Sequence, residues 1–145
     1  MDRKAYFWQV MDGHLPPPGA AATLGIRFTH IDAESGTIDT TFEANAGFTN
    51  PAGHVQGGFL AAMLDDTMGP AVFVMTEGKL YTATITMTVN FLAPAKPGKL
   101  IGEATVTQLG KTIAFVEARL MAEDGHTLAT ASASLRLVET AKAIR

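Results

Sequence analysis

Cysteine is absent from this sequence of 145 residues. Disulfide bonds, cysteine zinc sites and thiol nucleophiles are therefore excluded. The four histidines, His14, His30, His54 and His126, lack the spacing that is typical of metal ligands. We therefore expect no metal and no cofactor, and a site built from carboxylates, amides, hydroxyls and backbone groups.

Positive charge is also scarce, with 11 Lys and Arg against 14 Asp and Glu and a net charge of −3. The basic residues form no cluster, which argues against a nucleic-acid partner. No apolar run approaches the roughly 20 residues of a membrane span, and Met1 to Pro18 lacks the features of a signal peptide. We expect no membrane partner and a cytoplasmic protein.

Length and a hydrophobic content of 47% predict a single domain over residues 1–145. Residues 1–19 form its N-terminal helix, Asp2 to Met11, and a proline-rich connector. Apolar spacings of three and four residues then predict a long buried helix from Gly57 to Val72. Alternation and turn residues predict six strands: Leu24–Ile31, Thr37–Phe42, Ala83–Phe91, Lys99–Gln108, Thr112–Ala122 and Thr127–Val138.

The strand Ala83–Phe91 is predicted to have one apolar face and one hydroxyl-rich face. The apolar face holds Ala83, Ile85, Met87, Val89 and Phe91, and the other holds Thr82, Thr84, Thr86, Thr88 and Asn90. Short turns predict that the last four strands form an antiparallel meander. An antiparallel sheet wrapped around one long central helix is an α+β domain with the hotdog architecture.

Two glycines, Gly57 and Gly58, stand where the backbone enters the central helix. A helix N-terminus has unpaired N–H groups and a positive dipole end, so it can hold a developing oxyanion. Glycines there can equally serve the close approach of helix and sheet. Asp65 follows two turns later on nearly the same side, and Asp66 points about 100° away. A buried, unpaired carboxylate has a raised pKa and suits a base or a nucleophile, whereas a solvent-facing or paired one would be structural.

These residues together resemble a known family. The motif is Asn50-x-x-Gly53-x-x-Gln56-Gly57-Gly58, then Asp65, then the strand end Asn90-Phe91-Leu92-Ala93-Pro94-Ala95 with Gly98. It is similar to that of the PaaI-like acyl-CoA thioesterases of the phenylacetate-pathway type, which have the hotdog fold. The resemblance implies hydrolysis of an acyl-CoA to a free acid and CoA without a cofactor. It also implies a homodimer or homotetramer (a dimer of dimers) with sites at subunit interfaces.

The resemblance implies a role for each matched position. The backbone N–H of Gly57 polarises the thioester carbonyl, and Asp65 is the general base or the nucleophile. Asn50 places the thioester or the attacking water, and Thr84 matches a strand hydroxyl that assists the water from the neighbouring subunit. Gln56 stands where many members have histidine, so it can orient the carbonyl without adding charge.

Three further residues, Gly58, His54 and Asp66, are expected to contact the substrate, with His54 at the entrance. Two alternatives stay open: a hotdog module that binds acyl-CoA without cleaving it, and a hotdog dehydratase or hydratase, suggested by the string from His14 to Gly19. That string precedes the first strand, where no central helix can supply a partner acid. The acyl group itself, aryl, short or medium chain, is not determined.

Overall fold

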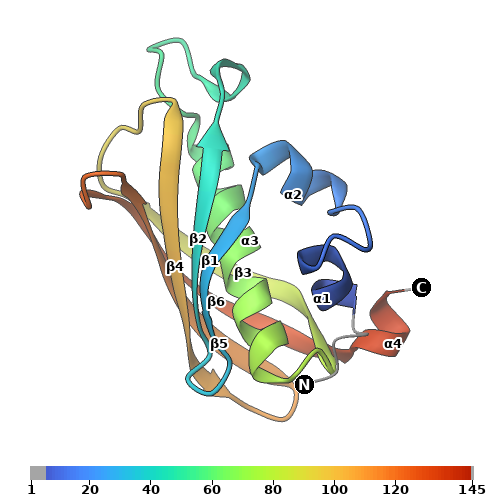
Figure 1. Cartoon of the computed structure of the whole chain (residues 1–145). Helices are drawn as coiled ribbons and strands as arrows, with labels where there is room; N and C mark the ends of the chain where they lie inside the picture. Colours follow the sequence, from blue (N-terminus) through green and yellow to red (C-terminus); the bar gives the residue numbers. More distant parts are fainter. Residues whose placement is uncertain (1–5, 145) are drawn as a thin grey trace.

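The computed structural model describes residues 6–144, which form one sheet around one long helix (Figure 1). The helices are α1 (Tyr6–Met11), α2 (Gly19–Leu24), the 3-10 helix η1 (Ala46–Phe48), α3 (Gly57–Met75) and α4 (Thr140–Ala143). The strands are β1 (Arg27–Asp32), β2 (Thr37–Ala44), β3 (Leu80–Phe91), β4 (Gly98–Leu109), β5 (Ile113–Ala122) and β6 (Thr127–Glu139).

The sheet is antiparallel, with the strand order β1-β2-β4-β5-β6-β3, and α3 lies along its inner face (Figure 1). The predicted α+β class and hotdog architecture are confirmed. The predicted four-strand meander is wrong in one respect: β4, β5 and β6 form a meander, but β3 pairs with β6 and β2 pairs with β4. The connection from β3 to β4 contains Pro94 and Pro97, which suit a stiff crossover better than a tight hairpin.

The N-terminal segment contains a helix that the sequence did not predict. Alternation predicted a strand from Leu24, but α2 occupies Gly19–Leu24 and β1 begins at Arg27. Pro18 directly before the helix, and Gly25 directly after it with a φ of 67°, are the usual start and stop signals. The predicted helix is confirmed over Tyr6–Met11, while Asp2–Ala5 lie outside the described residues.

Helix α3 supplies much of the core. It buries nine residues, among them Met63, Leu64 and Met68, which are completely covered. By length and composition alone this helix could cross a membrane, a test that the core helix of a soluble protein also passes. Here it packs against the sheet, where Thr67 and Thr40 pair their buried hydroxyls at 3.0 Å. That hydrogen bond fixes the helix against β2.

A β-bulge at Ile85 reverses which residues of β3 point towards the inner face of the sheet. Thr84 pairs with Leu135 of β6, and the next pair joins Thr86 to Ser134, so Ile85 is an extra residue. The prediction of one apolar and one hydroxyl face along the whole strand is therefore wrong. The inner face carries Thr82 and Thr84 before the bulge, and Met87, Val89 and Phe91 after it. Bulges commonly re-aim a side chain in this way.

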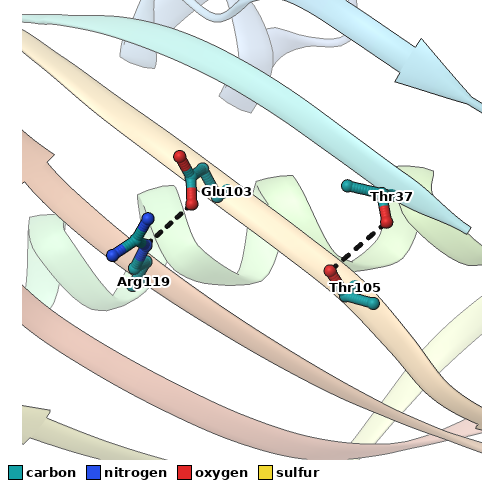
Figure 2. A network of polar contacts seen from close by, with 4 residues as sticks. All are labelled: Thr37, Glu103, Thr105 and Arg119. Carbon is teal, nitrogen blue, oxygen red and sulfur yellow. Dashed lines mark hydrogen bonds and ion pairs between the residues drawn. The ribbon is translucent and has the colours of Figure 1, made fainter.

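The outer face of the sheet carries polar contacts between neighbouring strands. Figure 2 shows Arg119 of β5 donating to Glu103 of β4 at 2.7 Å, and Thr37 of β2 beside Thr105 of β4 at 3.4 Å, with α3 behind the sheet. Such exposed pairs add little stability. The burial of the opposite, apolar face therefore sets the register of the sheet.

Candidate functional site

The N-terminus of α3 presents unpaired backbone donors. Gln56 is the N-cap, and its own N–H donates to the carbonyl of Phe48 at 2.8 Å. Within residues 6–144, the N–H groups of Gly57 and Gly58 have no acceptor. A 19-residue helix thus directs two free donors and its positive dipole end to the same point.

A compact loop holds Asn50 beside this terminus. The Asn50 side-chain oxygen accepts the backbone N–H groups of Ala52 at 3.0 Å and His54 at 3.1 Å. Because the oxygen is used in this way, the side-chain NH₂ group remains as a donor. Asn50, His54 and Gly57 line one groove of about 320 Å³. Gln56 is exposed beside it, and its side chain makes no capping hydrogen bond.

Phe91 at the end of β3 covers Gly57. A Cβ atom at position 57 would lie 3.3 Å from two carbons of the Phe91 ring, closer than most real contacts. At Gly58, by contrast, a Cβ atom would meet nothing within 4 Å. The close approach of helix and sheet is therefore a sufficient reason for glycine at 57, and it leaves the N–H of Gly57 free as well.

Asp65 and Thr84 form a pair in the middle of the same two elements. The Thr84 hydroxyl donates to Oδ1 of Asp65 at 2.8 Å, within one chain rather than from a neighbouring subunit. The bulge at Ile85 and the close packing at Gly69, where a Cβ would lie 3.1 Å from the Thr82 hydroxyl, bring strand and helix together. Asp65 is exposed in the single chain and paired with Thr84, so of the two alternatives that the sequence left open it does not have the surroundings of a buried, unpaired acid.

The more buried of the two acids is Asp66, whose side chain is half-buried. Its Oδ2 atom is inaccessible and has no hydrogen-bond partner among the described residues. Burial, with a smaller contribution from the charge of Asp65, raises the pKa of Asp66 from 3.8 to about 6. The environment that the sequence suggested for Asp65 therefore belongs to its neighbour, because the two side chains leave the helix on different sides.

This raised pKa predicts a pH-dependent stability. Between pH 3.8 and about 6 the folded chain binds more protons at Asp66 than the unfolded chain does, so stability falls as the pH rises through that window. After a discount for partial solvent screening, Asp66→Asn should stabilise the protein by about 1–2 kcal/mol at pH 7 and by little at pH 4. Urea unfolding at both pH values checks this, with the exposed Glu34→Gln as control. An unchanged pH dependence in Asp66→Asn would contradict it.

The two halves of the predicted site lie apart in a single chain. Eight residues separate Gly57 from Asp65, or about 12 Å along the helix axis. Asn50, His54 and Gly57 line one groove, whereas Asp65, Asp66 and Thr84 line a second cavity of about 280 Å³. One chain therefore does not bring these groups to one carbonyl.

Sequence reasoning missed the walls of the second cavity. Asp66, Pro70 and Phe73 lie on one face of α3 at helical spacing, and this face meets Tyr6 and Phe7 of α1. The spacing was visible in the sequence, but the return of the N-terminal segment over it was not. Within residues 6–144 no three His, Cys, Asp or Glu side chains cluster as a metal site would require.

Comparison with known proteins identifies the family. The sequence model of the Thioesterase superfamily matches residues 52–129, more than half of the chain. Human acyl-coenzyme A thioesterase 13 is 27% identical, with 70% of this chain and 78% of that protein covered.

Solved structures with a similar fold point to the same family. A phenylacetic acid degradation-related protein from Ralstonia eutropha superposes with a TM-score of 0.85 at 36% identity, covering 90% of this chain and 98% of that one. The E. coli PaaI protein gives 0.79 at 22% identity, covering 90% and 92%. A Streptococcus mutans protein solved with acetyl-CoA gives 0.69 at 19%, covering 79% and 89%. The chain therefore belongs to the thioesterase superfamily, has the PaaI-like hotdog fold and is a thioester hydrolase.

Proposed function

We propose that this protein hydrolyses acyl-CoA thioesters at sites shared between two copies of the chain. The observation that carries the proposal is the hydrogen bond from Thr84 to Asp65, which aims an exposed carboxylate at the edge of the sheet. The acyl-CoA thioesterase relative and the neighbour solved with acetyl-CoA support the substrate class.

The chemistry follows from what each group can donate or accept. Thr84 occupies Oδ1 of Asp65, so Oδ2 is left to take a proton from water. That water adds to the thioester carbon, and the oxyanion that forms accepts the free N–H of Gly57, with the Asn50 amide beside it. Collapse of the intermediate breaks the C–S bond and releases the free acid, and the proton held by Asp65 passes to the CoA thiolate, which restores the carboxylate.

The two edges of the sheet differ in a way that supports pairing through β3. The β1 edge has six residues, two of them charged, Arg27 and Asp32. The β3 edge has twelve residues and no charge. Long uncharged edges are open to pairing with another chain. Of the eight large apolar side chains that are exposed within residues 6–144, four lie on β3 or directly after it: Tyr81, Ile85, Phe91 and Leu92 are 44%, 55%, 55% and 60% exposed.

The positions of the two half-sites along β3 define a register. Thr84 contacts Asp65, and Phe91 covers Gly57 seven residues later. If two β3 strands pair antiparallel about an axis at Thr88, with Ile85 as the extra residue of the bulge, Thr84 of one copy faces Phe91 of the other. The Asp65 carboxylate of one chain then lies beside the helix N-terminus of the other, and two equivalent sites form.

A charge on the edge tests this arrangement. Thr88→Lys places two ammonium groups near the axis, so we expect monomers by light scattering and at least a tenfold loss of activity. Thr105→Lys is the matched control, since Thr105 also points outward but lies on β4, away from the edge, opposite Glu117. A Thr88→Lys variant that stays dimeric and fully active would rule out the β3 interface.

Release of free CoA thiol from a panel of acyl-CoA esters tests the function itself. The panel should contain short-chain, medium-chain and aryl esters, with saturable turnover expected for at least one of them. Binding of these esters by calorimetry without thiol release would favour the non-catalytic module. An enoyl product from a 3-hydroxyacyl-CoA would favour the dehydratase.

A further inference from the structure

Phe91 lines the groove that also contains Asn50 and Gly57. Its ring packs on the backbone of Gly57, where a Cβ atom would lie 3.3 Å from two ring carbons and 3.7 Å from a third. At Gly58, one residue further along the helix, a Cβ atom would meet nothing within 4 Å. The ring therefore lies against the first of the two glycines that carry free backbone donors and leaves the second open.

Backbone hydrogen bonds hold the ring in this place. Directly after Phe91, the N–H of Leu92 donates to the carbonyl of Leu128 in β6 at 2.8 Å. A few residues later the carbonyl of Ala95 accepts the N–H of Val55 at 2.8 Å, and Val55 directly precedes the N-cap of α3. The chain is thus tied to β6 on one side of the contact and to the start of α3 on the other, which fixes the ring relative to the helix N-terminus.

The outward surface of the ring is open in the single chain, since Phe91 is 55% exposed. A large apolar side chain left open at an uncharged sheet edge is suited to being covered by another chain. In the paired arrangement proposed above, Phe91 faces the Thr84 of the other copy, whose hydroxyl holds Asp65. The ring then lies between the carboxylate of one chain and the helix N-terminus of the other, the two groups that the hydrolysis needs together.

We propose that Phe91 is a positioning residue for the hydrolysis, which acts by keeping bulk water away from the backbone N–H of Gly57. This inference rests on the proposed function. The N–H leaves the chain next to the Cα atom on which the ring packs, so the ring occupies space that water would otherwise fill. A hydrogen bond to a charge is stronger where water is excluded, because the local dielectric constant is lower. The gain is larger for the oxyanion than for the neutral carbonyl of the bound ester, so it raises kcat more than it changes KM.

Amide exchange at the two glycines measures the shielding directly. The comparison uses Thr88→Lys chains with and without Phe91→Ala, so that pairing through β3 is removed from both samples. Magnetisation transfer from water, followed by NMR, should show exchange at Gly57 becoming several-fold faster when the ring is removed. Exchange at Gly58 should not change, because no side chain lies against it. Equal exchange at Gly57 in the two samples would overturn the inference.

Thiol-release kinetics supply the second measurement. Phe91→Ala should lower kcat about tenfold, less than the 10²–10³ expected for loss of the donor itself, and should change KM much less. Phe91→Leu retains an apolar cover and should recover most of the lost rate. Phe115→Ala is the matched control, since Phe115 is a 48% exposed phenylalanine on the outer face of β5, and it should keep the wild-type kcat.

The outcomes separate the role of Phe91 from the proposed function. Rates are taken at protein concentrations at which light scattering shows variant and wild type in the same oligomeric state, so a loss of kcat is not a loss of pairing. If Phe91→Ala keeps the wild-type kcat, or changes KM alone, the role of Phe91 is wrong and the hydrolase remains intact. If no acyl-CoA ester releases thiol, the proposed function fails and this inference fails with it, even where exchange at Gly57 responds to the ring.

Discussion

Asp65→Asn should lower kcat for acyl-CoA hydrolysis by a factor of about 10² to 10⁴ while leaving the fold unchanged. Asparagine keeps the shape and can still accept the Thr84 hydroxyl, but it cannot take a proton from water. Thiol-release kinetics measure the rate, and circular dichroism confirms that the variant is folded. Glu34→Gln, which neutralises an exposed carboxylate in the turn between β1 and β2, is the matched control and should retain wild-type rates.

Isotope labelling of the wild type distinguishes the two roles that the Asp65 carboxylate can have. As a base, Asp65 never bonds to the acyl group, so a single turnover in ¹⁸O water puts the label only into the free acid. As a nucleophile, it would form an anhydride, and attack of labelled water on its own carbonyl would leave ¹⁸O in the protein. Equal thiol release by wild type and Asp65→Asn would remove Asp65 from the mechanism altogether.

Gly57→Pro should lower kcat by about 10² to 10³, because it deletes one backbone donor to the oxyanion. Proline is well tolerated at the first position of a helix, and Gln56, with φ −56° and ψ 136°, already has the extended conformation that precedes proline. Gly57→Ala is the matched control, since it adds a Cβ against Phe91 but keeps the N–H. A large loss in Gly57→Pro with a small one in Gly57→Ala isolates the donor, whereas equal losses would point to steric displacement of Phe91.

Mixing the two inactive variants tests whether the site is shared. Asp65→Asn and Gly57→Pro chains, denatured together in equal amounts and refolded, should recover about a quarter of the wild-type activity. Half of the refolded dimers contain one chain of each variant. In such a dimer one shared site has both an intact carboxylate and an intact backbone donor, and the other site has neither, so a quarter of all sites are active. A site within one chain would recover nothing.

Much of the fold was predictable because its signals are local. The apolar helix from Gly57 and most of the alternating strands bury the residues that their periodicity predicts to be buried. The placement of β3 next to β6 could not be predicted, because strand pairing is a long-range contact and the crossover after Phe91 is compatible with more than one partner strand. Helix α2 was missed although Pro18 and Gly25 bracket it, because the following alternation was extended too far towards the N-terminus.

The candidate site was predictable in its members but not in its geometry. The motif identified both Gly57 and Asp65, but their spacing of eight residues also holds them about 12 Å apart along the axis of one helix. The bulge at Ile85, which turns the Thr84 hydroxyl inward, has no clear signature in a strand of alternating threonines. The burial of Asp66 depends on α1 folding back over α3, a contact between segments nearly sixty residues apart.

Pairing of two chains through the uncharged edge of β3 would make the catalytic rate per chain depend on the concentration of the protein. If each working centre needs two chains, dilution below the dissociation constant lowers the turnover per molecule as well as the total rate, since single chains carry only halves of a centre. A cell would then obtain disproportionately little thioester hydrolysis from a low level of expression. A modest rise in synthesis would raise the output more steeply than the amount of protein.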